Sequence, residues 1–139
     1  ADHFLKKEWQ VIVLGSINDA PLCKQIESRL DPENTGLLFN LSGLTNIVDA
    51  IDILAFSSLV LTNDSGLMHI AASVGTHLVA LYGPSSPDFT PPLSKKAIVL
   101  RKENGYRTDR VGTLPGGYDE SMASLKPNET IEALERIQI

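Results

Sequence analysis

The chain has 139 residues, which is enough for one domain and too few for two domains of ordinary size. Hydrophobic residues make up 42% and charged residues 21%, with a formal net charge of −5, so a buried core can form and no basic bias favours nucleic acid. The only cysteine, Cys23, excludes an internal disulfide and a cysteine-based metal site. No apolar run approaches the roughly 20 residues of a membrane-spanning helix, and no signal peptide is recognisable.

Apolar runs separated by turn residues predict strands that alternate with helices. Strands are predicted over residues 10–14, 37–41, 59–62, 78–82 and 97–101. Helices are predicted over 21–30, from Thr45 or Asn46 to about 56, over 65–74, and from 127 to the C-terminus. This alternation indicates an α/β fold, a three-layer α/β/α sandwich around a parallel sheet.

In open parallel sheets, ligands bind beyond the carboxyl ends of the strands. Three predicted loops lie at that edge. They cover residues 15–19, the segment Thr62-Asn63-Asp64-Ser65-Gly66, and the proline-rich residues 83–92. A ligand site is therefore expected where these loops meet.

The segment around Asp64 joins a predicted strand directly to a predicted helix. Gly66 removes a side chain from the first helical turn, where free backbone N–H groups and the helix dipole favour a phosphate or diphosphate. Ser65 and His69 are four residues apart and share a face of the helix, so His69 can donate to a phosphate or sugar oxygen. Asp64 suits sugar hydroxyls better than phosphate. Together these groups fit a sugar joined to a diphosphate.

Simpler roles exist for the same residues. Asp64 or Ser65 can act only as the N-cap of the helix, and His69 can be an exposed helix residue without a ligand. His77 is expected in a solvent-facing loop. The segment 101–110 has four basic and two acidic residues and could meet an anionic substrate, although a solvated loop is the default interpretation. No phosphate-binding loop, nucleophile elbow or metal-ligand cluster is present in the sequence.

The block Asn63-Asp64-Ser65-Gly66-Leu67-Met68-His69, followed by the segment 81–93 (LYGPSSPDFTPPL), resembles the ADP-heptose:lipopolysaccharide heptosyltransferases of glycosyltransferase family 9. The resemblance is closest to the heptosyltransferase II type, and weaker similarity covers nearly all of the chain. It implies the Rossmann-like C-terminal half of a two-domain GT-B enzyme. Residues 1–139 are then expected to form the ADP-heptose binding domain, lacking its first strand and the N-terminal acceptor domain.

Enzymes of this family transfer L-glycero-D-manno-heptose from ADP-heptose to the inner core of lipopolysaccharide, with inversion at the anomeric carbon. The resemblance implies that Asp64 holds heptose hydroxyls. It implies that the backbone amides of Ser65, Gly66 and Leu67 meet the diphosphate and that His69 lies beside it. No metal and no cofactor are expected.

The resemblance also places Leu44 and Thr45 at the adenine pocket and Asp19 near the ribose. No catalytic residue is expected in this chain, because the family's presumed base lies on the N-terminal domain, which also receives the lipid acceptor. The chain alone should therefore not catalyse transfer. The segment 118–121 has acids where the family tends to have His and Gln, which leaves its role open.

Two alternatives remain open from the sequence. One is a stand-alone nucleotide-sugar-binding module without catalysis, and the other is a transferase of the same family with another sugar donor. The full-length enzyme is expected in the cytoplasm, peripheral to the inner membrane of a Gram-negative bacterium.

Overall fold

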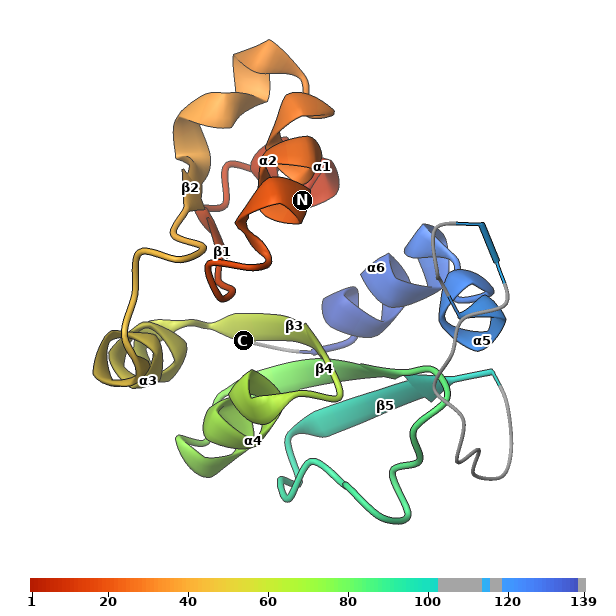
Figure 1. Cartoon of the computed structure of the whole chain (residues 1–139). Coiled ribbons are helices and arrows are strands. Elements are labelled where there is room, and N and C mark those ends of the chain that lie inside the picture. The colour runs from red at the N-terminus through yellow and green to blue at the C-terminus, as the bar shows by residue number, and fades with distance from the viewer. Residues whose placement is uncertain (103–113, 116–118, 138–139) are drawn as a thin grey trace. The chain divides into compact units, whose positions relative to one another are not determined.

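The computed structural model describes residues 1–102, 114–115 and 119–137, and these form two compact units, residues 1–50 and 51–139, each described here by itself (Figure 1). The helices are α1 (Asp2–Leu5), α2 (Ala20–Ser28), the 3-10 helix η1 (Pro32–Leu37), α3 (Ile47–Phe56), α4 (Gly66–Ser73), α5 (Glu120–Ala123) and α6 (Pro127–Glu135). The strands are β1 (Val11–Val13), β2 (Leu38–Asn40), β3 (Leu59–Asn63), β4 (His77–Tyr82) and β5 (Ala97–Arg101). In these described parts, every helix is too short or too polar to cross a bilayer.

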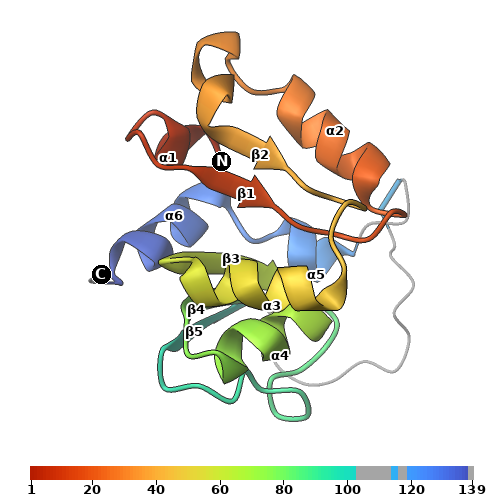
Figure 2. The same cartoon turned by 90° about the vertical axis from the view of Figure 1, so that its left-hand side faces the viewer.

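The first unit is built on a parallel pair of strands, with Val11 of β1 opposite Leu38 of β2. Helix α2 connects the two strands and packs against β2 (Figure 2). The loops that follow the strands meet at their carboxyl ends, where Gly43 N donates to Gly15 O at 2.9 Å. Of the three loops that the sequence places at a carboxyl edge, residues 15–19 belong to this unit, and they lie there beside the loop that follows β2.

The second unit contains a three-stranded parallel sheet in the order β3-β4-β5. Helix α4 lies on one face of this sheet, and α5 and α6 lie on the other (Figures 1 and 2). The central strand β4 is covered on both sides, so Leu78, Val79, Ala80 and Tyr82 have no exposed surface. A near-continuous apolar run is what a parallel strand buried on both faces requires. Two parallel sheets, the second with helices on both faces, confirm the predicted α/β fold class.

All the strands and the four longer helices that were predicted are present, with ends that differ by a few residues. Asn46, not Thr45, caps α3, because its Oδ1 accepts from Val48 N at 2.8 Å and Asp49 N at 3.0 Å. The prediction of a loop around His77 is wrong, since this residue opens β4 opposite Leu59. Its neighbour Gly75 ends the helix two residues earlier, which leaves little room for a loop.

The short elements α1, η1 and α5 were not predicted. The helices α1 and α5 have 4 residues each, which is too short for apolar periodicity to show. Helix η1 had a local signal, since Asp31 precedes Pro32 and its carboxylate accepts from Glu33 N at 3.2 Å. An aspartate before a first-turn proline is a typical helix start.

Gly75 ends α4 in a left-handed conformation, with φ +80°. We expect Gly75→Ala to lower the free energy of unfolding by about 1 to 2 kcal/mol, because a Cβ is strained at positive φ. Gly75→Asn should lower the free energy of unfolding by less, since asparagine tolerates positive φ better than alanine. The control is Gly36→Ala, where the added Cβ meets no atom within 4 Å and φ is not positive. Urea unfolding that finds equal losses for Gly75→Ala and Gly36→Ala would contradict this account of the helix end.

Candidate functional site

The candidate site lies at the carboxyl edge of β3 and β4. Asp64 follows β3 directly, and its backbone N donates to Leu81 O at 3.2 Å, which extends the β3–β4 ladder by one residue. The loop of residues 83–92 follows β4 at the same edge. The two segments of the sequence motif, 63–69 and 81–93, are therefore brought together in space by parallel pairing of their strands.

The N-terminus of α4 has no side-chain cap. Ser65 occupies the N-cap position with an extended backbone (φ −152°, ψ 170°), yet its side chain makes no capping hydrogen bond, and its Oγ lies 3.4 Å from Thr62 Oγ1. A Cβ built on Gly66 would meet no atom within 4 Å. Met68 N donates to Ser65 O at 3.1 Å, whereas among the described residues the N–H groups of Gly66 and Leu67 have no acceptor. These two N–H groups and the open space beside Gly66 are what an anion site requires.

Asp64 is half-buried, and its carboxylate is held by a residue of the other motif segment. Thr90 Oγ1 donates to Asp64 Oδ2 at 3.0 Å. The carbonyl oxygen of Thr90 in turn accepts from the hydroxyl of the buried Tyr82, which also lies 3.3 Å from Met68 Sδ. The explanation that Asp64 or Ser65 serves only as a helix cap is thus wrong for this structure.

The proline-rich loop is held by hydrogen bonds as well as by its prolines. Ser86 is 1% exposed, and its Oγ accepts from Asp88 N at 3.2 Å and from Arg101 Nη1 at 3.3 Å. Its carbonyl oxygen accepts from Phe89 N and Thr90 N, each at 3.1 Å. The loop is a compact turn that delivers Thr90 to Asp64.

The pKa of Tyr82 reflects its burial and its position beside Asp64 and Thr90. Burial raises the pKa of Tyr82 to about 12, the negative charge of Asp64 adds to the rise, and the hydrogen bond to Thr90 opposes it. The phenol therefore stays protonated at neutral pH and remains a donor to Thr90.

The remaining motif residues lie on the first turns of α4. Leu67 is half-buried, and His69 is exposed one turn after Ser65. His69 is therefore outside the core, on the same face of α4 as Ser65 at the helix N-terminus. Its role toward a ligand stays a prediction.

Asp19, Leu44 and Thr45 lie together in the first unit, at the carboxyl edge of β1 and β2. The carboxylate of Asp19 accepts from Ser16 Oγ at 2.6 Å and Ser16 N at 2.8 Å, and these bonds lower its pKa. Asp19 occupies the N-cap position of α2 without capping it. Leu44 is 75% exposed, and Thr45 is half-buried. Their roles toward a nucleotide are likewise predictions.

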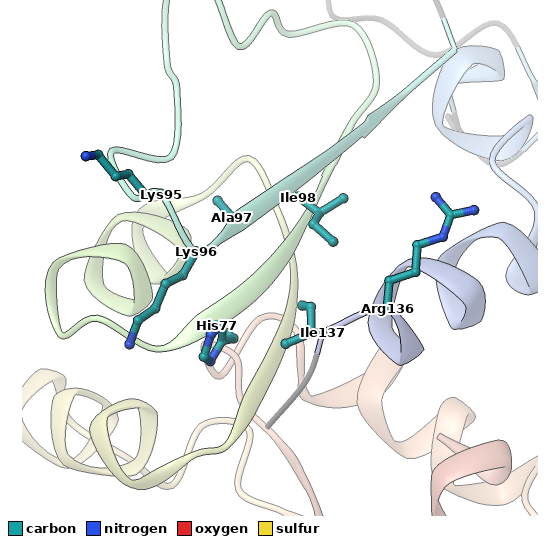
Figure 3. A pocket seen from close by; sticks show the side chains of 7 residues that line it. All are labelled: His77, Lys95, Lys96, Ala97, Ile98, Arg136 and Ile137. Carbon is teal, nitrogen blue, oxygen red and sulfur yellow. The ribbon is translucent and has the colours of Figure 1, made fainter.

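A separate open cavity of about 370 Å³ lies at the opposite edge of the second sheet, at the amino ends of β4 and β5 (Figure 3). Its lining contains His77, Lys95, Lys96 and Arg136. Lys96 Nζ donates to Gly75 O at 2.7 Å, and the side chains of Lys95 and Arg136 point away from each other in Figure 3. The cations do not converge on one point, so the cavity does not form a focused anion site.

The basic segment 101–110 lies outside the described residues beyond Lys102, which pairs with Glu129 of α6. Tyr118 also lies outside them. The neighbouring Asp119 caps α5 by accepting from Ser121 N at 2.9 Å. An acid at this position therefore has a structural role. Among the described residues, no group of three or more His, Cys, Asp or Glu side chains could hold a metal ion.

Comparisons with known proteins agree on one family. A family model described as glycosyltransferase family 9 (heptosyltransferase) matches residues 1–115. Lipopolysaccharide heptosyltransferase 2 of Salmonella typhimurium is 42% identical over 134 residues, which cover 96% of this chain and 38% of that protein. Lipooligosaccharide heptosyltransferase 2 of Haemophilus influenzae is 41% identical over 138 residues, covering 99% and 40%.

Solved structures give the same result. The ADP-heptose LPS heptosyltransferase II of E. coli matches with a TM-score of 0.82 and 39% identity, over 95% of this chain and 38% of that one. A family 9 glycosyl transferase of Veillonella parvula matches with a TM-score of 0.83 and 26% identity, over 98% and 38%. The chain thus spans only 38% to 40% of the length of these relatives.

Tyr82→Phe tests the connection between the core and the loop. At neutral pH, we expect a loss of about 1 kcal/mol in the free energy of unfolding, because the hydrogen bond to Thr90 is removed. The unfolded phenol ionises near pH 10 and the folded one near pH 12, so the wild type loses stability as the pH rises through this range. The variant lacks this titration. The difference between the two proteins should shrink in urea unfolding toward about pH 11, and a constant difference would contradict the proposed burial of the hydroxyl.

Proposed function

Because the chain belongs to glycosyltransferase family 9, whose model matches residues 1–115, we propose that it is the donor-binding part of a type II heptosyltransferase. The observation that supports this most directly is the open N-terminus of α4 beside the carboxylate of Asp64, which Thr90 holds in place. The proposed donor is ADP-heptose, and the proposed reaction of the whole protein is transfer of heptose to the inner core of lipopolysaccharide with inversion.

The diphosphate is proposed to bind at the first turn of α4. The amides of Ser65, Gly66 and Leu67 offer donors, and the helix dipole favours negative charge there. As the bond to the sugar breaks, charge grows on the leaving ADP. Donors already oriented toward that position stabilise it without rearrangement, which lowers the barrier. The exposed His69 can donate to the same phosphates.

The sugar is proposed to be recognised by Asp64. One carboxylate oxygen, Oδ2, already accepts from Thr90. Among the described residues, no donor reaches the other oxygen, so Oδ1 is available to accept from heptose hydroxyls. Hydrogen bonds to a charged acceptor are the stronger kind, which suits a group that discriminates a sugar nucleotide from the bare nucleotide.

The adenosine is proposed to bind at the carboxyl edge of β1 and β2. The exposed side chain of Leu44 offers apolar surface for adenine, with Thr45 beside it. Asp19 is the candidate for the ribose, although its carboxylate already accepts two hydrogen bonds from Ser16. A carboxylate has about four acceptor positions, so it retains capacity for a ribose hydroxyl.

The acceptor and the catalytic base are proposed to come from the part of the relatives' length that this chain does not span. A base there would remove the proton from the acceptor hydroxyl as it attacks the anomeric carbon. On this proposal the chain alone binds the donor and does not transfer it. The complete protein would work in the cytoplasm, at the inner membrane surface where the lipid acceptor is found.

Asp64→Ala tests whether the Asp64 carboxylate recognises the heptose. Calorimetric titration should find ADP-heptose binding weakened about 10- to 100-fold, because a hydrogen bond to a charged group is lost, and ADP binding weakened less than about threefold. The control is Asp52→Ala on the exposed surface of α3, which should change neither affinity. An equal loss for both ligands would show that Asp64 does not read the sugar. If the unaltered chain binds neither ligand, or another sugar nucleotide binds more tightly, the proposed donor is wrong.

Gly66→Ala tests the diphosphate site independently. The added Cβ would meet no protein atom, so the fold should be unchanged or slightly stabilised. It would occupy the space in front of the helix N-terminus, and we expect the affinities for ADP and ADP-heptose to fall together, by about tenfold. Gly36→Ala, whose Cβ also meets open space, should leave both affinities unchanged. Unchanged affinities in Gly66→Ala would place the diphosphate elsewhere.

A further inference from the structure

We propose that Thr90 is a positioning residue for the donor sugar, whose hydroxyl fixes the carboxylate of Asp64 so that its second oxygen faces the ligand. This inference rests on the proposed function, because it concerns how the sugar-reading carboxylate is oriented. Thr90 belongs to the loop after β4 and Asp64 to the segment after β3, and 26 residues separate them in sequence.

The hydroxyl of Thr90 has two acceptors within reach and only one hydrogen. Asp64 Oδ2 lies at 3.0 Å and the carbonyl oxygen of Ser86 at 3.2 Å. The carboxylate is charged and closer, so it is the stronger acceptor. The Ser86 carbonyl already accepts from two backbone N–H groups, those of Phe89 and Thr90, and does not need the hydroxyl. The Thr90 hydroxyl therefore donates mainly to Asp64 Oδ2.

Thr90 is itself held from two sides, so its hydroxyl has a defined position. Its carbonyl oxygen accepts from the hydroxyl of Tyr82, which has no exposed surface and ends the central strand β4. Its backbone N donates to Ser86 O within the compact turn at 3.1 Å. The position of the Asp64 carboxylate is thus set by the core of the unit.

An aspartate at a strand end can otherwise rotate about its side-chain bonds. Anchoring one oxygen removes part of this freedom before the ligand arrives, which lowers the entropy cost of binding. Among the described residues, Thr90 is the one whose side chain donates to Asp64. The other nearby hydroxyls do not replace it, since Thr62 Oγ1 donates to Asn63 O at 2.9 Å and lies 3.4 Å from Ser65 Oγ.

The test compares Thr90→Val, which keeps the shape and removes the hydroxyl, with Thr90→Ser, which keeps the hydroxyl. Calorimetric titration of ADP-heptose and of ADP into each variant of the chain gives an affinity ratio. Thr90→Val should weaken ADP-heptose binding about tenfold and ADP binding by less than about twofold. Thr90→Ser should retain most of the affinity for both ligands.

Thr76→Val is the matched control. The Thr76 hydroxyl donates to Leu54 O at 2.6 Å in the buried core of the same unit, away from the carboxyl edge. The same chemical change at Thr76 should lower stability and leave the affinity ratio unchanged. If Thr90→Val does not fold, Tyr82→Phe is the second variant, because it releases the backbone of Thr90 while its hydroxyl remains. Tyr82→Phe should also lower the affinity for ADP-heptose, by a smaller factor than Thr90→Val.

The double variant Asp64→Ala/Thr90→Val decides whether Thr90 acts through Asp64. If it does, Thr90→Val has no further effect on ADP-heptose affinity once Asp64 is alanine. A loss that persists in that background, or an equal loss for ADP and ADP-heptose, overturns the positioning role. If Asp64→Ala is selective for the sugar nucleotide and Thr90→Val is not, only this inference fails. If Asp64→Ala itself is not selective, the proposed function fails with it.

Discussion

The hydrogen bond from the Tyr82 hydroxyl to the Thr90 carbonyl connects the buried core of the second unit to its ligand-facing edge. Tyr82 ends a strand that is covered by helices on both faces, so its ring cannot move without disturbing the core. Its hydroxyl must find a partner because an unpaired buried donor is costly. The turn of residues 86–90 provides that partner, and the same turn brings the Thr90 side chain to Asp64.

Two groups with different chemistry, a helix N-terminus and a carboxylate, therefore lie at one sheet edge. The first turn of α4 offers the backbone N–H groups of Gly66 and Leu67, which have no acceptor among the described residues and favour a group with diffuse negative charge. Asp64 offers a charged acceptor, which repels phosphate and favours hydroxyls. A ligand that places a diphosphate on the helix end and a sugar on the carboxylate satisfies both. The combination of these two groups favours a sugar nucleotide as the ligand over a nucleotide alone.

Much of this arrangement could be predicted from the sequence. The strands, the longer helices and the position of Asp64 to His69 at the start of α4 follow from local signals, and the structure agrees with them. The cap interpretation of Ser65 could not be settled in the same way, because a serine at a helix start is compatible with either role. The short helices α1 and α5 were missed because one turn has no measurable periodicity.

The sequence by itself determined the order of strands and helices and which residues follow each strand, because apolar periodicity, glycine and proline act over a few neighbouring residues. The family followed separately, from the resemblance of the segments 63–69 and 81–93. Only the tertiary structure decided that Thr90, rather than Ser85 or Ser86 in the same loop, donates to Asp64. That choice depends on parallel pairing of β3 with β4 and on the turn that Ser86 closes. Contacts between residues 26 positions apart are set by packing and strand register, which no local pattern specifies.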